Sequence, residues 1–382
     1  MHPLSVYIHW PFCKSKCPYC DFNSHVRNDV DSERWQKALL HELAYYAAKL
    51  PDRQVVSIFF GGGTPSLMPA TTVSALIEQV NSLWAVSEDI EITLEANPTS
   101  IEAKKFRDFR KSGVNRVSIG VQSFEPEDLK FLGREHNVQE AMGALLMAAD
   151  IFPRMSFDLI YARPNQTLAA WEAELTQALT YAKDHLSLYQ LTIEENTAFH
   201  HTYHNGGFTL PEEGLAADMY MLTQDIMEAN GLPAYEISNH AWAGQESRHN
   251  LAYWKSQDYI GIGAGAHGRY NQESGRISTE NIKSPERWLE KVEQSDNGLT
   301  AETAISEKES LEEAVMMGLR LSSGIHYDEW QKQMGADLRK AIPETAIDKL
   351  REQTLIEADE NHIKATRKGR LLLNRVTGEL LS

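Results

Sequence analysis

Short β-rich runs alternate with segments of helical periodicity between Leu4 and Asn230, and this alternation constrains the fold more than any other feature of the sequence. In the intervening segments apolar residues recur three or four positions apart, as do Val73, Leu76 and Val80. Strands that alternate with helices are typical of parallel βαβ units. The candidate strands are Leu4–His9, Val55–Phe60, Ile90–Glu95, Arg116–Gln122, Met155–Tyr161 and His185–Thr192.

The positions of polar residues distinguish a barrel from an open sheet. Glu95, Gln122 and Asp158 lie at or near the C-terminal ends of three different strands, and Gly61-Gly62-Gly63 follows the second strand. Barrel enzymes build their sites from the C-terminal ends of several strands, whereas an open doubly wound sheet concentrates its site at one switch point. The sequence therefore predicts an α/β fold with a partial (β/α)6 TIM-like barrel.

The chain changes character after residue 235, which predicts three parts: a barrel at 1–235, an extension at 236–298 and a C-terminal module at 299–382. The extension is rich in aromatic residues, His and Gly, and Asn271–Gly298 reads as a connector with one helix, Pro285–Gln294. In the last part helical patterns at Ser306–Ser322, Tyr327–Met334 and Pro343–Glu352 precede a hairpin at Leu355–Thr366. This order predicts a small helical, winged-helix-like domain.

The net charge and the hydropathy of the chain limit the partners that it can bind and the compartment in which we expect it. The formal net charge of −17 opposes nonspecific binding to nucleic acid, so none is expected, although Arg367-Lys368-Gly369-Arg370 leaves that alternative open for the C-terminal module. Met1–His9 lacks the pattern of a signal peptide, and no stretch approaches the ~20 apolar residues of a membrane span. Clustered cysteines favour a reducing compartment. We expect a cytoplasmic protein that is not integral to a membrane.

All three cysteines of the chain lie within the segment Cys-Lys-Ser-Lys-Cys-Pro-Tyr-Cys, at Cys13, Cys17 and Cys20, directly after the first strand. Two metal chemistries compete for such a cluster. A structural zinc site needs a fourth ligand, for which His25 is the nearest candidate. An iron–sulfur cluster held by three cysteines leaves one iron with an open position for chemistry.

The spacing CxxxCxxC, with Tyr19 before the last cysteine and Tyr7-Ile8-His9-Trp10-Pro11-Phe12 leading into the first, resembles the radical S-adenosylmethionine (radical SAM) superfamily. This resemblance implies a 4Fe-4S cluster bound by the three cysteines. It also implies that the fourth iron takes the amino and carboxylate groups of S-adenosyl-L-methionine (SAM). Reduction of the cluster would then cleave SAM to a 5′-deoxyadenosyl radical, a reaction whose chemistry belongs to the cofactor.

Gly61-Gly62-Gly63-Thr64-Pro65 resembles the glycine motif of one subgroup, the coproporphyrinogen dehydrogenase-like proteins. One departure from their pattern is Ala162-Arg163-Pro164, where relatives usually carry Gly-Leu-Pro. Carboxylates can accept hydroxyl or ammonium protons, and arginine can bind a carboxylate. The resemblance implies SAM contacts from Tyr7, Tyr19, Gly62, Gly63, Thr64, Glu95, Gln122, Arg134 and Asp158.

The segment from His249 to Trp254 resembles the HNxxYW motif of the haem chaperones of the HemW type. An imidazole beside aromatic side chains suits axial ligation of haem iron, so the resemblance implies a haem ligand at His249, with His240 and His267 as alternatives. The porphyrinogen dehydrogenase carries a further cysteine two residues after the third, where this chain has Phe22. Only 12 residues precede Cys13, fewer than the N-terminal arm of that enzyme.

The sequence thus predicts a haem chaperone that binds haem, a 4Fe-4S cluster and SAM and transfers haem to acceptor haemoproteins. By analogy, the acceptors include respiratory proteins at the inner membrane. Two enzymes remain as alternatives. One is an oxygen-independent coproporphyrinogen III dehydrogenase, which is a radical SAM oxidative decarboxylase, and the other is a radical SAM enzyme that acts on a different substrate.

Overall fold

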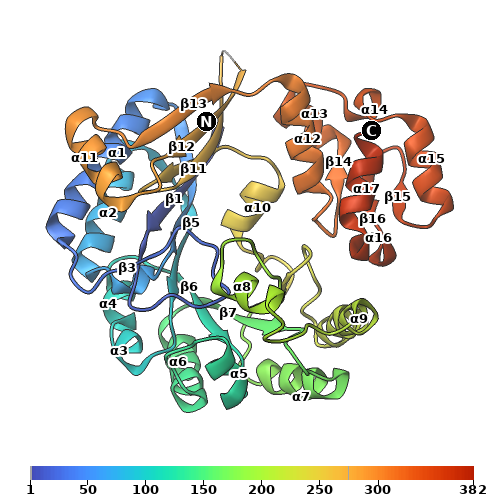
Figure 1. The fold of residues 1–382 in the computed structure, drawn as a ribbon. Helices are drawn as coiled ribbons and strands as arrows, with labels where there is room; N and C mark the ends of the chain where they lie inside the picture. The colour runs from blue at the N-terminus through green and yellow to red at the C-terminus, as the bar shows by residue number, and fades with distance from the viewer. Residues whose placement is uncertain (1, 274) are drawn as a thin grey trace.

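The computed structural model describes residues 2–273 and 275–382, and an eleven-stranded curved sheet is its largest element (Figure 1). Its central strands are neighbours in chain order and parallel to one another. They are β1 (His2–Trp10), β4 (Arg53–Gly62), β5 (Ala85–Ala96), β6 (Arg116–Gln122), β7 (Arg154–Tyr161) and β8 (His185–Gln190). The predicted strands and the partial barrel that they form are confirmed.

Most of the helices that follow the strands cover the outer face of the curved sheet, whereas α8 (Ala198–His204) lies inside its arc (Figure 1). Local sequence explains their starts: Asp31 caps α1, Asn137 and Glu140 form a capping box on α6, and Pro126 opens α5. Within the part of the chain that the structure describes, no helix has the length and apolarity that a membrane crossing requires. The helices are α1 (Ser32–Lys49), η1 (Pro65–Leu67), α2 (Ala70–Leu83), α3 (Ser100–Ala103), α4 (Phe106–Lys111), α5 (Pro126–Phe131), α6 (Val138–Ile151), α7 (Leu168–Leu179), α8 (Ala198–His204) and α9 (Glu213–Ala229).

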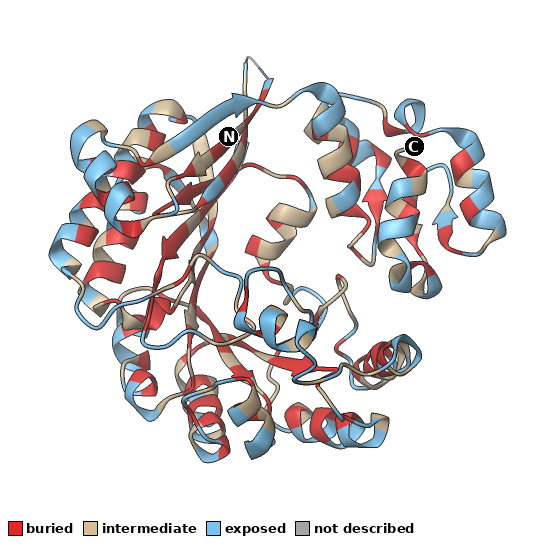
Figure 2. Cartoon of the chain, viewed as in Figure 1, coloured by how far each residue is buried: buried red, intermediate tan, exposed pale blue. Residues whose placement is uncertain are grey.

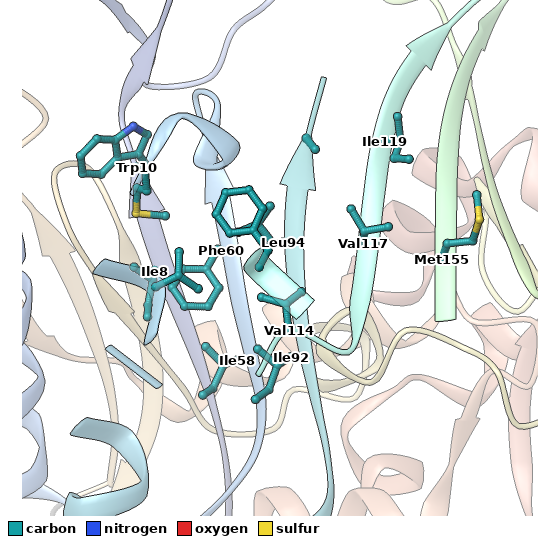
Figure 3. Close-up of a cluster of buried hydrophobic side chains, with 14 of the residues drawn as sticks. Ile8, Trp10, Ile58, Phe60, Ile92, Leu94, Val114, Val117, Ile119 and Met155 are labelled. Atoms are coloured by element: carbon teal, nitrogen blue, oxygen red, sulfur yellow. The ribbon is translucent and has the colours of Figure 1, made fainter. Parts of the chain in front are cut away.

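The hydrophobic core lies between the strands and these helices, on one face of the sheet. Ile92 and Leu94 on β5 and Val117 and Ile119 on β6 are buried in it (Figures 2 and 3). Because successive side chains of a strand point to opposite faces, the residues between them point into the barrel. Ser118 is one of these, and it lines a pocket rather than the core. The same strands therefore build the core on one face and a polar interior on the other.

Further strands extend the sheet at both edges. β10 (Tyr259–Ile262) pairs parallel with β1, and β11 (His267–Gln272), β12 (Gly275–Asn281) and β13 (Leu299–Ala304) follow antiparallel, while β9 (Asn239–Ala241) pairs antiparallel with β8. The helix expected in this region is confirmed as α11 (Pro285–Ser295), but the rest of the expected connector is wrong, since β12 lies within it. The alternate positions that β12 buries are Ile277, Thr279 and Asn281, and only Ile277 among them is apolar.

The C-terminal domain, residues 307–380, has buried positions of its own (Figure 2). Its hydrophobic core includes Val315, Leu319, Ile363 and Val376. The predicted hairpin is present as β15 and β16, which pair antiparallel. Boundaries at residues 235 and 298 stay predictions. The elements are α12 (Glu307–Gly318), β14 (Ile325–His326), α13 (Tyr327–Met334), α14 (Leu338–Ala341), α15 (Glu344–Glu352), β15 (Ile356–Ala358), β16 (His362–Ala365), α16 (Arg367–Leu371) and α17 (Leu373–Leu380).

Candidate cofactor site

A pocket of about 450 Å³ lies at the C-terminal ends of the parallel strands. It brings together most of the residues that the sequence singles out, although they come from separate strands and loops. Of the predicted cluster ligands and SAM contacts, Tyr7 does not line it, and the predicted haem ligand His249 lies outside it as well. Those that line it are Cys13, Cys17, Tyr19, Cys20, Gly62, Gly63, Thr64, Glu95, Gln122, Arg134 and Asp158. Their individual roles stay predictions.

The cysteine loop is held by a small parallel ladder between β2 (Phe12–Cys13) and β3 (His25–Val26). A turn bond from the backbone N–H of Cys20 to the carbonyl of Cys17, 3.1 Å long, places the last two thiols on one bend. All three cysteines are free thiols. Three free sulfur ligands on one pocket wall are the donor set that a cluster with one open iron requires.

Each sulfur also has a polar neighbour. The hydroxyl of Thr64 donates to Cys13 Sγ at 3.4 Å, Arg134 Nη1 donates to Cys17 Sγ at 3.2 Å, and the Ser24 hydroxyl lies 3.7 Å from Cys20 Sγ. These groups orient the sulfur atoms and stabilise thiolates, because hydrogen bonds to the charged form favour it.

Burial raises the pKa of the Cys13 and Cys20 thiols, and the hydrogen bonds from Thr64 and Ser24 only partly oppose it. Metal binding must therefore displace protons from these two sulfur atoms. His25, the candidate fourth ligand of a zinc site, has its Nε2 atom 3.1 Å from Asn23 Oδ1 and does not line the pocket. The structure thus leaves three sulfur donors at the pocket wall.

The glycines after β4 bring backbone close to the cysteine loop. Gly62 has φ of 113°, and a Cβ atom there would lie 2.5 Å from the His9 ring. A Cβ atom on Gly63 would lie 2.8 Å from the carbonyl oxygen of Phe12. The backbone N–H of Gly63 donates to the Trp10 carbonyl at 2.7 Å. Side chains are therefore excluded at both positions, which explains the glycine run.

Two carboxyl groups, of Glu95 and Asp158, face the pocket from β5 and β7. Both are partly exposed to the pocket but lie inside the barrel, and burial raises the pKa of Glu95 to about 8 and that of Asp158 to about 6. Repulsion from Asp158 adds to the shift at Glu95, which accepts a hydrogen bond of 3.2 Å from the Gly62 N–H. A cationic ligand would favour the ionised form of both groups.

Arg134 connects the cysteine loop with the strand ends. In addition to Cys17, its guanidinium donates to Asn97 Oδ1 at 2.7 Å, to the Gly120 carbonyl at 2.8 Å and to the Tyr19 hydroxyl at 3.4 Å. Near it, Gln122 adopts φ of 72° where the pairing of β6 with β7 shifts register. A positive φ in a residue other than glycine is typical of functional sites.

Some of the pocket residues were not predicted from the sequence. Asn97 bridges Arg134 and the Thr64 hydroxyl, and it lies two positions after Glu95, directly beyond the end of β5. Tyr189 lines the pocket near the end of β8. Its position at the end of a predicted strand was the available signal. Phe22, singled out as a substitution, also lines the pocket and is 59% exposed.

His249 lies away from the pocket, on α10 (Arg248–Trp254), which packs against β4. Its side chain is 1% exposed, and its ring stacks on Phe59 at a centroid distance of 4.9 Å. Nδ1 lies 3.0 Å from the Ser57 hydroxyl and Nε2 lies 2.9 Å from the Tyr253 hydroxyl. Burial lowers the pKa of His249 to about 3. In this conformation both ring nitrogens are occupied, so the predicted ligation of haem iron requires one of these two contacts to break.

The other residues near this helix occupy different environments. The ring centroid of Tyr7 lies 6.2 Å from that of His249, and the Tyr7 hydroxyl is 2.9 Å from His9 Nδ1. Of the alternative haem ligands, His240 is 1% exposed with Nε2 3.3 Å from Gln224 Nε2, whereas His267 is exposed. Only His267 is accessible to a ligand without rearrangement.

Arg163, the departure from the subgroup pattern, is a structural anchor after β7. It is 1% exposed, forms an ion pair with Glu174 on α7 and lies 3.1 Å from Asp128 on α5. It does not line the pocket. The unusual arginine therefore fixes two helices to the end of β7 and does not contact the candidate site.

Comparison with known proteins places this geometry in a family. The model of the radical SAM superfamily matches residues 7–177, and that of the HemN C-terminal domain matches residues 305–372. The heme chaperone HemW of Bacillus subtilis is 34% identical over 99% of both chains. HemW of Escherichia coli is 42% identical over 75% of this chain and 76% of that protein.

Two further similarities extend over nearly the whole chain. The mitochondrial radical S-adenosyl methionine domain-containing protein 1 of Danio rerio is 33% identical over 99% of this chain and 86% of that protein. The solved structure of coproporphyrinogen III oxidase (HemN) from E. coli covers all of this chain and 90% of its own, with a TM-score of 0.83 and 23% identity, which shows a shared fold. The chain therefore belongs to the radical SAM superfamily and, within it, to the family that contains HemW and radical S-adenosyl methionine domain-containing protein 1.

Proposed function

We propose that this protein is a haem chaperone that binds haem, a 4Fe-4S cluster and SAM and passes haem to acceptor haemoproteins. The observation that carries this proposal is the full-length similarity to HemW of B. subtilis, which is named a heme chaperone. Membership of the radical SAM superfamily implies the cluster and SAM. The free cysteines of the pocket wall supply the sulfur donors.

The residues of the pocket have distinct parts in this proposal. Cys13, Cys17 and Cys20 would hold the cluster, which when bound supplies an electron and one open iron for SAM. Glu95 and Asp158 would accept hydrogen bonds from the ammonium or hydroxyl groups of SAM. The close backbone approach at Gly62 and Gly63 leaves room for its amino acid part, which side chains there would block.

Haem binding involves the helix α10. His249 would donate its imidazole to haem iron, and the rings of Tyr253 and Trp254 would pack against the macrocycle. Because His249 is buried and both its nitrogens are occupied, binding must break its contact with the Tyr253 hydroxyl or the Ser57 hydroxyl.

The residue at position 22 favours the chaperone over the dehydrogenase. Phe22 lines the pocket next to the cysteine loop, and it stands where the dehydrogenase carries a further cysteine. An exposed phenyl ring at this point supplies an apolar contact but neither a proton nor a metal ligand. We further propose acceptors among respiratory haem proteins at the inner membrane, and a reducing compartment such as the cytoplasm in which the free thiols persist.

Spectra of anaerobically reconstituted protein, taken with and without added haemin, test the proposal. The expected result is cluster absorbance, a Soret band that saturates with haemin, and haem transfer to an apo b-type cytochrome. Cys17→Ser should abolish the cluster absorbance, whereas Ser15→Ala on the same loop should retain it. His249→Ala should weaken or shift the Soret band more than His240→Ala or His267→Ala.

Two outcomes would contradict the proposal that the protein is a haem chaperone. Conversion of coproporphyrinogen to protoporphyrinogen by the reduced protein with SAM would establish the dehydrogenase instead. Cleavage of SAM by a protein that takes up no haem would indicate an enzyme with another substrate.

A further inference from the structure

Arg116, on β6, carries a positive charge inside the barrel without a carboxylate in contact. It is 2% exposed, and its guanidinium donates to Ser156 Oγ at 2.9 Å and to Thr93 Oγ1 at 3.5 Å. Within residues 2–273 and 275–382 its Nε atom has no hydrogen-bond partner and no acidic group forms an ion pair with it. A buried charge without such a partner is costly, by several kcal/mol in typical proteins.

The neighbouring arginine shows the ordinary arrangement. Arg154 is the register partner of Arg116 on β7, and it forms ion pairs with Glu91 at 2.6 Å and Asp184 at 3.3 Å. Those two contacts fully explain Arg154 as a structural residue. The charge of Arg116 has no such explanation. The carboxyl groups whose pKa it lowers are Asp158 and Glu95 at the pocket, and it also lowers the pKa of Tyr235, His185 and His249.

A chain of hydroxyl groups connects Arg116 to one of these carboxylates. The Ser156 hydroxyl accepts from Arg116 and donates to Ser118 Oγ at 2.9 Å. The Ser118 hydroxyl in turn donates to Asp158 Oδ1 at 3.5 Å. All three donors are therefore aligned from the guanidinium toward the carboxylate, and aligned hydrogen bonds polarise one another inside a protein.

We propose that Arg116 is a positioning residue of the cofactor site, which acts through Ser156 and Ser118 to hold the Asp158 carboxylate charged and oriented toward the pocket. A carboxylate held in this way binds a ligand that carries a hydroxyl or ammonium donor. The inference rests on the proposed binding of SAM. Four charged or titratable groups act on Asp158 or are acted on by it, namely Glu95, Arg116, Arg134 and Tyr189, and a hydrogen bond from Ser187 also lowers the pKa of Asp158. Arg116 differs from the others because it is not itself in the pocket wall.

The test is equilibrium dialysis of SAM against the reconstituted protein at a series of pH values. Arg116→Met removes the cation at similar volume, so protonation of Asp158 should extend to higher pH. SAM affinity should fall most at acidic pH. The midpoint of this loss of affinity should move to higher pH by about one unit for each tenfold decrease in the acid dissociation constant of Asp158. Ser118→Ala, which keeps the cation but breaks the chain, should shift the midpoint in the same direction by less.

Controls separate this effect from a loss of folding. Ser5→Ala removes another buried barrel serine, bonded to Ser57 rather than to the chain that reaches Asp158, and should leave the pH profile unchanged. In an Asp158→Asn background, Arg116→Met should cause no further loss of affinity. The inference is overturned if Arg116→Met and Ser118→Ala keep the wild-type midpoint. It is also overturned if Arg116→Met lowers the SAM affinity of the Asp158→Asn variant as much as it lowers that of the wild type. If the wild-type protein does not bind SAM, the proposed site and the inference fall together.

Discussion

The guanidinium of Arg320 lies over the indole ring of Trp254, 4.6 Å from the ring centroid. Arg320 follows α12 in the C-terminal domain, and Trp254 is the last residue of α10. A second link joins the same parts, since Gln333 Nε2 donates to the Ser256 carbonyl at 2.9 Å. Figure 1 places α10 between the arc of strands and the C-terminal domain. The helix that carries His249 is therefore held from both sides.

This arrangement predicts that weakening the domain contact accelerates haem uptake. Arg320→Met removes a cation–π contact of about 1 kcal/mol, which corresponds to roughly a fivefold larger population of released α10. The same change also removes the cation that lies 3.5 Å from the buried Glu236 carboxylate, which keeps its bonds to the Ser238 N–H and the Asn239 amide, so the variant should also be less stable and its rate is measured on folded protein. Stopped-flow mixing with haemin measures the association rate.

A matched control for this prediction is Arg34→Met, which removes an ion pair with Glu293 between α1 and α11 and leaves α10 untouched. Its haem association rate should equal that of the wild type. Equal rates in Arg320→Met and the wild type would show that the contact between Arg320 and Trp254 does not restrain the haem site.

The glycine run predicts a contrast between two substitutions to alanine. Gly62→Ala should destabilise the protein and prevent SAM binding, because its φ of 113° and its contact with the His9 ring leave no space for a methyl group. Gly143→Ala, in the exposed interior of α6 with no atom near its Cβ, should stabilise the protein by about 0.5–1 kcal/mol. Chemical denaturation measures both. Normal SAM affinity in a folded Gly62→Ala variant would contradict the close backbone approach.

The carboxyl of Glu95 predicts a pH-dependent stability of the cofactor-free protein. Its folded-state pKa of about 8 exceeds the ordinary value of 4.5, so the folded state binds a proton that the unfolded state releases. Stability is therefore lost as the pH rises from 4.5 through about 8. Glu95→Gln should flatten this dependence and be more stable than the wild type at the alkaline end, while it loses SAM affinity.

Urea denaturation at several pH values measures this effect, with Glu78→Gln as an exposed control on α2. The control should follow the wild-type profile. A Glu95→Gln profile parallel to that of the wild type would mean that Glu95 titrates normally in the folded protein.

Sequence patterns predicted those parts of the molecule that depend on local periodicity and on the parallel barrel. Glu95 and Asp158 meet because parallel strands end on one side of the barrel, a rule that needs no coordinates. The strand around Ile277 was not predicted because it buries mostly polar side chains. The burial of His249 depends on contacts with Ser57 and Phe59, about 190 residues earlier in the chain, which no motif encodes.

Arg163 supports the last prediction, which separates a structural role from a functional one. Arg163→Met should lower the free energy of unfolding by about 3–5 kcal/mol, because it leaves the Glu174 carboxylate buried without its cation. Adding Glu174→Gln should recover part of the loss, since the amide oxygen can still accept from the Ser123 hydroxyl and the Phe124 N–H. Because Arg163 does not line the pocket, the SAM affinity of the folded variants should stay within about twofold of the wild-type value, a difference of about 0.4 kcal/mol. Urea denaturation and equilibrium dialysis on the same samples measure the two quantities, and a loss of SAM affinity at unchanged stability would assign Arg163 to the cofactor site.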